Sequence, residues 1–258
     1  TIDTRNMEFE ELKEKIVKFV KEELYSLEPW IYSCEWDEKL PKLNELREKV
    51  KKMGLWLPQI STDYGGIGLS LQEHGEISEI LGGSPYGFYV FNCQAPDAGN
   101  MEILIEVGTS QQKKDYLTPL LEGKTRSCFA MTEPGYAGSN PTRMGTVAKK
   151  ENGNYIINGH KWFTSSFDGA DFAIVMVVTD PDEANPYKRA SQIIVPTKTK
   201  GVEFVRNVSI MGHPGGGWES HAEIKFNNVI VPESNLLGFE GDGFAIAQKR
   251  LGPGSIIV

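Results

Sequence analysis

The sequence predicts an α+β fold with more than one domain, in which an N-terminal all-α helical domain precedes a β-barrel-like domain. Apolar residues recur at helical spacing up to about residue 125, whereas short strand-like runs separated by turn residues follow from Arg126. Near Leu236 the helical pattern returns. We therefore predict a helical domain at 1–125, a β domain at 126–236 and the start of a second helical domain at 237–258.

The first domain should contain five helices. In the first of them, Leu12, Ile16 and Phe19 form one apolar stripe among Lys and Glu residues, which is typical of an amphipathic helix packed on a core. The Gly-Gly-Ser-Pro run at 82–85 should end a later helix. The predicted helices cover residues 7–27, 40–53, 71–81, 100–107 and 111–121.

The β domain should contain seven or eight strands. The turn at 151–154 joins two strand-like runs as a hairpin, which should fold the second run back beside the segment that starts at Ser127. After these strands a helix should begin at Gly243, and the Gly-Pro-Gly run at 252–254 should interrupt it. The predicted strands cover residues 127–131, 146–149, 155–157, 172–178, 191–195, 202–205 and 221–226.

Composition excludes several classes of function. The net charge is −8 and no basic block is long enough to follow a phosphate backbone, so we predict no nucleic-acid partner. The longest apolar run is far below the ~20 residues of a membrane-spanning helix, so we expect no transmembrane segment. Three widely spaced cysteines indicate a reducing compartment. We expect the cytoplasm, or the mitochondrial matrix if the protein is eukaryotic. Only His213 and His221 share a segment, and we predict no metal site there.

The run Cys-Phe-Ala-Met-Thr-Glu-Pro-Gly-Tyr-Ala-Gly-Ser-Asn at 128–140 is the most informative in the chain. Its small residues Gly135, Ala137 and Gly138 let the backbone approach an anion closely, and Ser139 adds a hydroxyl. The hairpin brings Ile-Asn-Gly-His-Lys-Trp-Phe-Thr-Ser, at 157–165, beside it. Together they offer what a flat cofactor with a pyrophosphate needs: donors for the anion, an apolar face and hydroxyls. The alternative is a plain Pro-Gly turn, and no GxGxxG follows a strand, so a Rossmann site is not indicated.

At these residues the chain resembles an acyl-CoA dehydrogenase. That family carries a Thr-Glu-Pro loop ending in Gly-Ser, then an Asn-Gly-x-Lys strand that leads to an aromatic residue and a Thr or Ser. Segments 54–56 and 64–70 resemble its helical domain, and 92–102 and 250–254 resemble a branch that acts on longer acyl chains and is sometimes fused to a kinase-like domain. The resemblance covers the whole chain. It implies FAD-dependent α,β-dehydrogenation of fatty acyl-CoA thioesters, as in fatty acid β-oxidation.

The resemblance also implies roles for single residues. Thr132 would contact the pyrimidine edge of the flavin, and Ser139 would contact both the FAD phosphates and the acyl-CoA substrate. Phe163 stands where the family usually has Trp against the ring, and Trp162 would point into the core unless a β-bulge exchanges the two. Ser165 matches a hydroxyl near flavin N5. The cofactor set is Phe129, Met131, Thr132, Gly138, Ser139, Phe163, Thr164 and Ser165, of which Phe129 and Met131 could equally be core residues.

The catalytic base is not among these residues. In the family it is a carboxylate of a C-terminal helical bundle, which we expect to be largely missing here and to lie beyond Val258, and a minority position for it is Gly254 in this chain. Glu133 should be structural and accept nearby amides. We therefore expect this chain alone to be inactive or nearly so.

The resemblance further implies partners: a fatty acyl-CoA substrate, an electron-transferring flavoprotein as acceptor, and further copies of the chain in a homotetramer. The Gly-rich segment 211–218 resembles a loop near the flavin, although an ordinary surface loop is the alternative. Two other functions stay open. One is a flavin- or acyl-CoA-binding module without chemistry, and the other is an acyl-CoA oxidase or flavin monooxygenase of the same fold.

Overall fold

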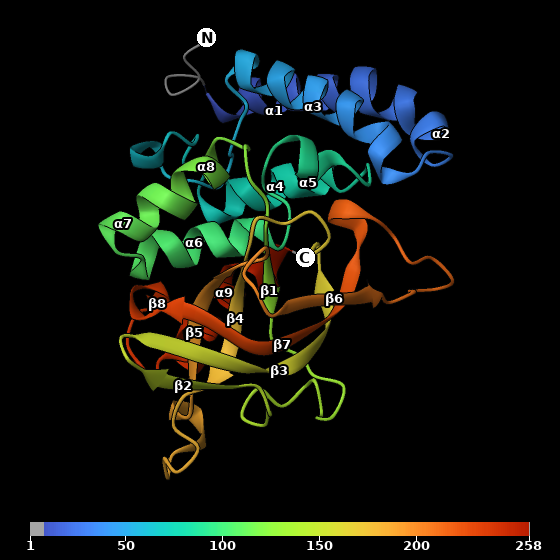
Figure 1. The fold of residues 1–258 in the computed structure, drawn as a ribbon. Coiled ribbons are helices and arrows are strands. Elements are labelled where there is room, and N and C mark those ends of the chain that lie inside the picture. Colours follow the sequence, from blue (N-terminus) through green and yellow to red (C-terminus); the bar gives the residue numbers. More distant parts are fainter. Residues whose placement is uncertain (1–7, 258) are drawn as a thin grey trace. The chain divides into compact units, whose positions relative to one another are not determined.

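The computed structural model describes the backbone of residues 8–257 and the side chains of residues 8–250. The chain divides into two compact units (Figure 1). The first comprises residues up to Ala98 with the short segment from Pro253, and the second comprises Gly99–Gly252. Each unit is described by itself below.

The first unit is helical, as predicted. The first predicted helix is an α-helix whose last turns widen into a π-helical turn at Val20–Leu24 and tighten into a 3-10 turn at Tyr25–Leu27. Its stripe of Leu12, Ile16 and Phe19 is buried. The helices are α1 (Phe9–Phe19), α2 (Glu28–Ile31), α3 (Trp36–Met53), α4 (Leu71–Leu81) and α5 (Gly87–Val90), with α6 (Asp97–Val107) beginning at the end of the unit.

Capping residues set the ends of two of these helices. The helix predicted from residue 40 begins earlier, at Trp36, because Glu35 and Glu38 form a reciprocal capping box before it. In α4, Ser70 and Glu73 form the same arrangement, and the helix has the predicted bounds. Helix starts therefore follow the local capping chemistry more closely than the apolar stripe.

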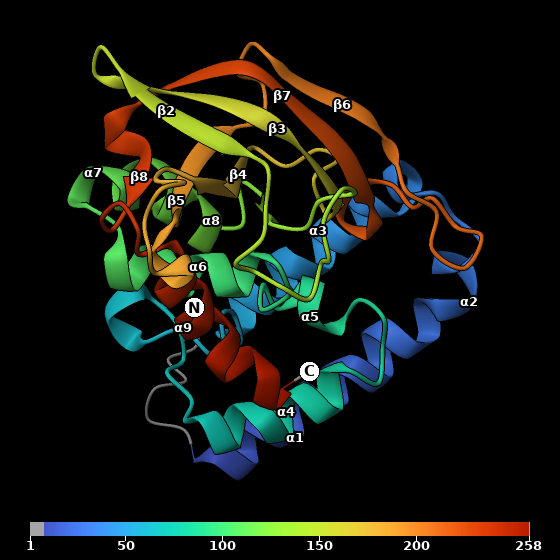
Figure 2. The ribbon, with the colours of Figure 1, turned by 90° about the horizontal axis from the view of Figure 1, so that it is seen from below.

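The second unit continues α6 through α7 (Ser110–Gln112), a π-helical turn at Lys113–Leu117 and α8 (Thr118–Leu121), and then forms a mixed sheet. The strand order is β6-β7-β3-β2-β4-β5-β8, and β1 pairs with β4 in parallel. Figures 1 and 2 show β2, β3, β7 and β6 as neighbours on one curved side of this sheet. The strands are β1 (Ser127–Ala130), β2 (Val147–Glu151), β3 (Asn154–Ser165), β4 (Phe172–Val178), β5 (Ala190–Pro196), β6 (Val202–Asn207), β7 (His221–Pro232) and β8 (Leu236–Leu237).

The predicted hairpin is confirmed. β2 and β3 pair antiparallel up to Glu151 and Asn154, and the two residues between them, Asn152 and Gly153, both have positive φ, 50° and 78°. Such a two-residue turn matches the twist of the strands that it joins. β3 then runs to Ser165, far past the three residues predicted. The prediction was too short because two register shifts against β7 break the alternation of apolar and polar residues that marks a strand in a sequence.

Two predictions near the end of the chain are wrong. The residues at 236–237 do not begin a helix but form β8, which pairs with β5 through Gln192 and Ile193. The helix α9 (Gly243–Ile257) begins at Gly243, as predicted, but its backbone continues through the Gly-Pro-Gly run that we expected to interrupt it. A proline removes only one i→i−4 hydrogen bond, so the bonds on either side of it can carry a helix onward. Within the described part of the chain, none of the helices combines the length and apolar character needed to cross a membrane.

Candidate functional site

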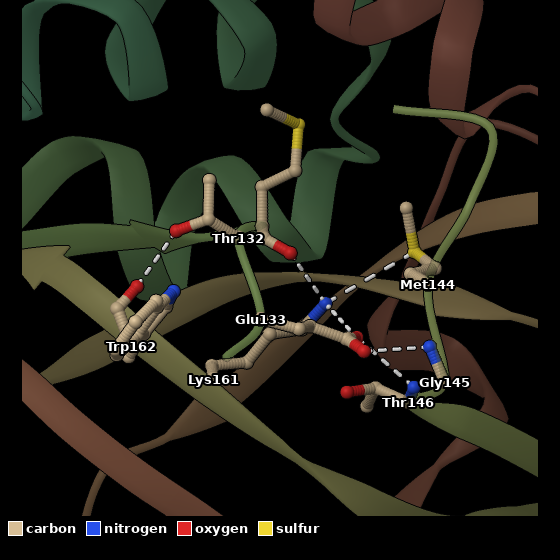
Figure 3. Close-up of polar contacts among 8 residues, drawn as sticks. Thr132, Glu133, Met144, Gly145, Thr146, Lys161 and Trp162 are labelled. Atoms are coloured by element: carbon tan, nitrogen blue, oxygen red, sulfur yellow. Dashed lines mark hydrogen bonds and ion pairs between the residues drawn. The ribbon is translucent and has the colours of Figure 1, made fainter. Parts of the chain in front are cut away.

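The segment that follows β1 lies beside the C-terminal half of β3, as predicted (Figure 3). The backbone amide of Trp162 donates to the Thr132 carbonyl at 3.0 Å, and the Thr132 hydroxyl donates to the Trp162 carbonyl at 2.7 Å. The hydroxyl hydrogen of Thr132 is therefore used within the protein. What Thr132 can still offer a ligand is an acceptor oxygen and its backbone amide, which donates to no group within the described residues.

The loop that leaves the sheet at Thr132 and returns at Gly145, here called the 132–145 loop, exposes unused backbone donors. Its internal backbone hydrogen bonds involve the amides of Tyr136, Asn140 and Arg143. Among the residues that the structure describes, the amides of Gly135, Ala137, Gly138 and Ser139 donate to no protein group, and all four residues are exposed. Consecutive free amides form a concave donor surface that suits an anion.

The glycines of this region are of two kinds. A methyl group added at Gly138 would meet only the Thr132 side chain, at 3.5 Å, and Gly138 has no positive φ. A methyl group at Gly159 would lie 2.2 Å from the Thr146 hydroxyl. Packing within the protein therefore requires glycine at 159 but not at 138, where the missing side chain leaves room beside free amides.

The two aromatic residues of β3 do not alternate between faces. The register against β7 shifts between Lys161 and Thr164, and Phe163 has a left-handed φ of 48°. Trp162 is half-buried rather than a core residue, Phe163 is 41% exposed, and their ring centroids lie 4.9 Å apart. The prediction that Trp162 belongs to the core is wrong because the bulge turns both rings toward accessible surface.

Two hydroxyl residues follow the aromatic pair. Thr164 is buried, and within the described residues its hydroxyl has no hydrogen-bond partner. Ser165 Oγ lies 2.9 Å from His221 Nδ1 on β7. Burial lowers the pKa of His221, so the ring is neutral at pH 7.

Phe129 and Met131 were predicted either to line the flavin or to belong to the core, and their burial is intermediate between these two roles. Both are half-buried and, with Met144, pack against a small buried cluster of Met176, Ala190 and Ala247. The Arg250 guanidinium carbon lies 4.4 Å from the centre of the Phe129 ring. These residues form an apolar cluster next to the 132–145 loop.

A buried ion pair lies at the base of the loop (Figure 3). Lys161 is 0% exposed and Glu133 5%, and Lys161 Nζ lies 2.8 Å from Glu133 Oε1. The Glu133 carboxylate also accepts from the amides of Gly145 at 2.6 Å and Thr146 at 3.0 Å, which confirms the predicted structural role of this residue. Burial alone would raise the pKa of Glu133, but the Lys161 charge and these hydrogen bonds outweigh it and hold the pKa below its ordinary value.

Lys161 is the residue of the site to which sequence reasoning assigned no role. The only signal for it was a lysine at an inward position of a strand, within the Asn-Gly-His-Lys run. Burial lowers its pKa to about 8, although the neighbouring Glu133 acts in the opposite direction. Both side chains are therefore charged at pH 7.

The Gly-rich segment 211–218 has an exposed tip and an anchored end. Met211 is fully exposed, whereas the Trp218 carbonyl accepts from Ser166 Oγ at 2.7 Å and the Gly217 amide donates to Asp168 at 3.2 Å. The anchored end thus lies at the turn that follows Ser165. Within the described chain, no group of three or more His, Cys, Asp and Glu residues could hold a metal ion.

Comparison with known proteins shows two family matches and close structural relatives. The N-terminal domain of acyl-CoA dehydrogenases matches residues 6–124, and the middle domain matches residues 128–229. The acyl-CoA dehydrogenase family member 10 of Mus musculus is 42% identical over an alignment of 259 positions, which covers 95% of this chain and 24% of that protein. A solved structure from Mycobacterium abscessus, assigned as an acyl-CoA dehydrogenase, is 35% identical with a TM-score of 0.89 and covers 96% of this chain and 64% of its own.

A third similar protein was solved with a cofactor. PigA, solved with FAD and proline, is 25% identical with a TM-score of 0.76, and the match covers 98% of this chain and 63% of PigA. The chain spans between about a quarter and half of the length of the first curated relatives that it matches.

Proposed function

The chain belongs to the acyl-CoA dehydrogenase family, and from this premise we propose that it binds FAD and a fatty acyl-CoA thioester for α,β-dehydrogenation of the acyl chain. One observation carries the proposal: the 132–145 loop, which presents the free amides, begins at Thr132, and Thr132 is hydrogen-bonded to Trp162 of the accessible aromatic pair of β3. A ligand that carries both an anionic group and a flat ring needs amide donors and an aromatic surface close together. The similar structure PigA contains FAD.

The residues present fit this cofactor. The amides from Gly135 to Ser139 suit a pyrophosphate, and the space at Gly138 lets it approach the backbone. Phe163 and Trp162 offer aromatic faces to the flavin ring, and we infer that Thr164, the next residue of the strand, belongs to the same site. We infer the same site for Thr132, Ser139, Ser165, Phe129 and Met131, with Ser139 also contacting the acyl-CoA.

When bound, FAD supplies the oxidant of the reaction, which takes hydride from the β-carbon while a base takes the α-proton. The residues of this chain would bind the cofactor and the substrate and orient them. Ser165 is held by His221 at 2.9 Å, so its hydroxyl has a defined direction. Glu133 is unsuited to act as the base, because Lys161 neutralises its charge and both of its oxygens accept hydrogen bonds. We further propose an electron-transferring flavoprotein as acceptor and a homo-oligomeric assembly, as the family resemblance implies.

A titration of the purified chain with FAD tests the proposal. We expect quenched flavin fluorescence and a shifted visible spectrum, and little loss of the flavin absorbance when long-chain acyl-CoA is added without oxygen, because no residue of this chain is assigned as the base. Robust bleaching by acyl-CoA would overturn the expectation that this chain alone is nearly inactive, binding without bleaching also fits a module without chemistry, and oxygen consumption would identify an oxidase or monooxygenase. A chain that leaves the FAD spectrum and fluorescence unchanged would contradict the proposal.

A further inference from the structure

Two opposite charges lie enclosed where the 132–145 loop leaves and rejoins the sheet. Lys161 Nζ donates to the Met131 carbonyl and to Glu133 Oε1, each at 2.8 Å, and its third direction faces Met144 Sδ at 4.0 Å (Figure 3). Glu133 in turn accepts the amides of Gly145 and Thr146. Through these contacts β3 holds the chain both before and after the loop.

We propose that the Glu133–Lys161 pair is a positioning pair, which fixes both ends of the 132–145 loop so that its free amides stay arranged for the FAD pyrophosphate. This inference rests on the proposed function, since it assigns FAD to the loop. Between its ends the loop is largely exposed and has few backbone hydrogen bonds of its own. Its conformation therefore depends on how its two ends are held.

Stability alone does not account for this pair. Taking two charges out of water is costly, and apolar residues of similar volume often stabilise a core equally well. Apolar residues, however, could neither accept the amides of Gly145 and Thr146 nor donate to the Met131 carbonyl. The specific gain from the charges is the fixed direction of four hydrogen bonds, which matters most if the loop must match a ligand.

Hydrogen exchange measured by mass spectrometry tests the geometric part without any ligand. In the wild type we expect the amides of Gly145 and Thr146 to exchange slowly, since both donate to a buried carboxylate. In Glu133→Gln and Lys161→Met, exchange over residues 133–146 should rise by about tenfold or more, while β4 and β5 stay protected. Unchanged exchange in both variants would overturn the proposal.

FAD affinity tests the functional part. Both single variants should bind FAD at least about tenfold more weakly than the wild type. The double variant E133Q/K161M removes both charges, so its melting temperature should recover toward that of the wild type. Its FAD affinity should stay at least about tenfold reduced, because the bond to the Met131 carbonyl is still missing.

A charge-matched control separates local from general effects. Glu233 pairs with Lys150 at 2.7 Å on the surface, and Glu233→Gln makes the same change in charge away from the loop. It should leave both exchange and FAD affinity within about twofold of the wild type. A double variant that regains full FAD affinity would reduce the pair to a purely structural role and overturn the inference. A wild-type chain that binds no FAD would contradict the proposed function itself, whereas equal binding by wild type and variants would contradict only the positioning role.

Discussion

Lys161 carries a full charge inside the protein, and this has a consequence for stability against pH. Burial lowers its pKa to about 8 in the folded chain from an ordinary 10.5. Between these values the unfolded chain binds more protons than the folded chain, so the free energy of unfolding rises with pH. Below pH 8 both states are protonated and the cost of burying the charge is fully present.

We therefore predict that the wild type gains up to about 3 kcal/mol in free energy of unfolding, relative to E133Q/K161M, between about pH 8 and pH 10.5. The double variant lacks the titrating amine, and Glu133 stays ionised throughout this range, so the difference isolates Lys161. Urea unfolding of both proteins at three pH values measures it. Parallel stability curves would show that Lys161 titrates normally.

Gly138 and Gly159 should respond oppositely to the same substitution. For Gly138→Ala we expect a free energy of unfolding that is unchanged or higher by up to about 1 kcal/mol, because the backbone suits alanine and only Thr132 is near. FAD affinity should fall by about tenfold or more, because the methyl group occupies the space beside the free amides.

Gly159→Ala is the internal comparison. Its methyl group would overlap Thr146, so the free energy of unfolding should drop by about 1–3 kcal/mol. Thermal unfolding and flavin fluorescence of both variants give the two quantities. If Gly138→Ala binds FAD as the wild type does, the ligand does not approach the backbone there.

At the scale of single elements, the bulge of β3 holds a residue in a strained conformation. Phe163 has a φ of 48° and is 41% exposed, so neither its backbone preference nor its burial favours it at this position. Strain of this kind is found preferentially at functional sites. We expect the strained conformation to be retained because it places the Phe163 ring where it can stack on the proposed flavin.

Phe163→Gly should accordingly keep or raise the free energy of unfolding, by up to about 1 kcal/mol, since glycine relieves the left-handed φ. FAD affinity should fall by about tenfold through loss of the stacking ring. Asn152→Gly is a matched control, because Asn152 also has a left-handed φ, 50°, but lies in the hairpin turn. It should show the stability effect without the loss of affinity.

The elements show which signals a sequence carries well. β4 has its predicted bounds because a fully apolar run between turn residues is unambiguous, and α4 has its predicted bounds because Ser70 caps it. β3 and β7 were predicted too short, since register shifts disrupt the period of two. The hairpin turn still placed the loop of Thr132 beside Trp162.

The remaining details of the site depend on contacts between distant residues. Nothing near Lys161 in the sequence indicates that its partner is Glu133, 28 positions earlier. The acceptor of the Thr132 hydroxyl is likewise a backbone carbonyl 30 positions away. The predicted roles of Gly138, Ser139, Phe163, Thr164 and Ser165 stay predictions until a ligand is bound.

At the scale of the whole molecule, every residue assigned to FAD lies within the second unit. A ligand stabilises the state that it binds by RT ln(1 + [L]/Kd), about 2.7 kcal/mol at a hundredfold excess over Kd. Saturating FAD should therefore slow hydrogen exchange in the core strands of residues 99–252 more than in helices α1, α3 and α4 of the first unit. Equal slowing in both units would contradict a site confined to the second.

The order of residues along β3 also limits how this protein can change. Lys161 anchors the loop, while Trp162 and Phe163, the next two residues, present the rings. One short stretch of backbone is thus a common frame for both halves of the proposed site, and a shift of this strand displaces both together. A substitution at any of these three positions would alter the loop and the aromatic rings together. Attempts to redesign the specificity of the site should therefore keep these positions and vary the surrounding residues.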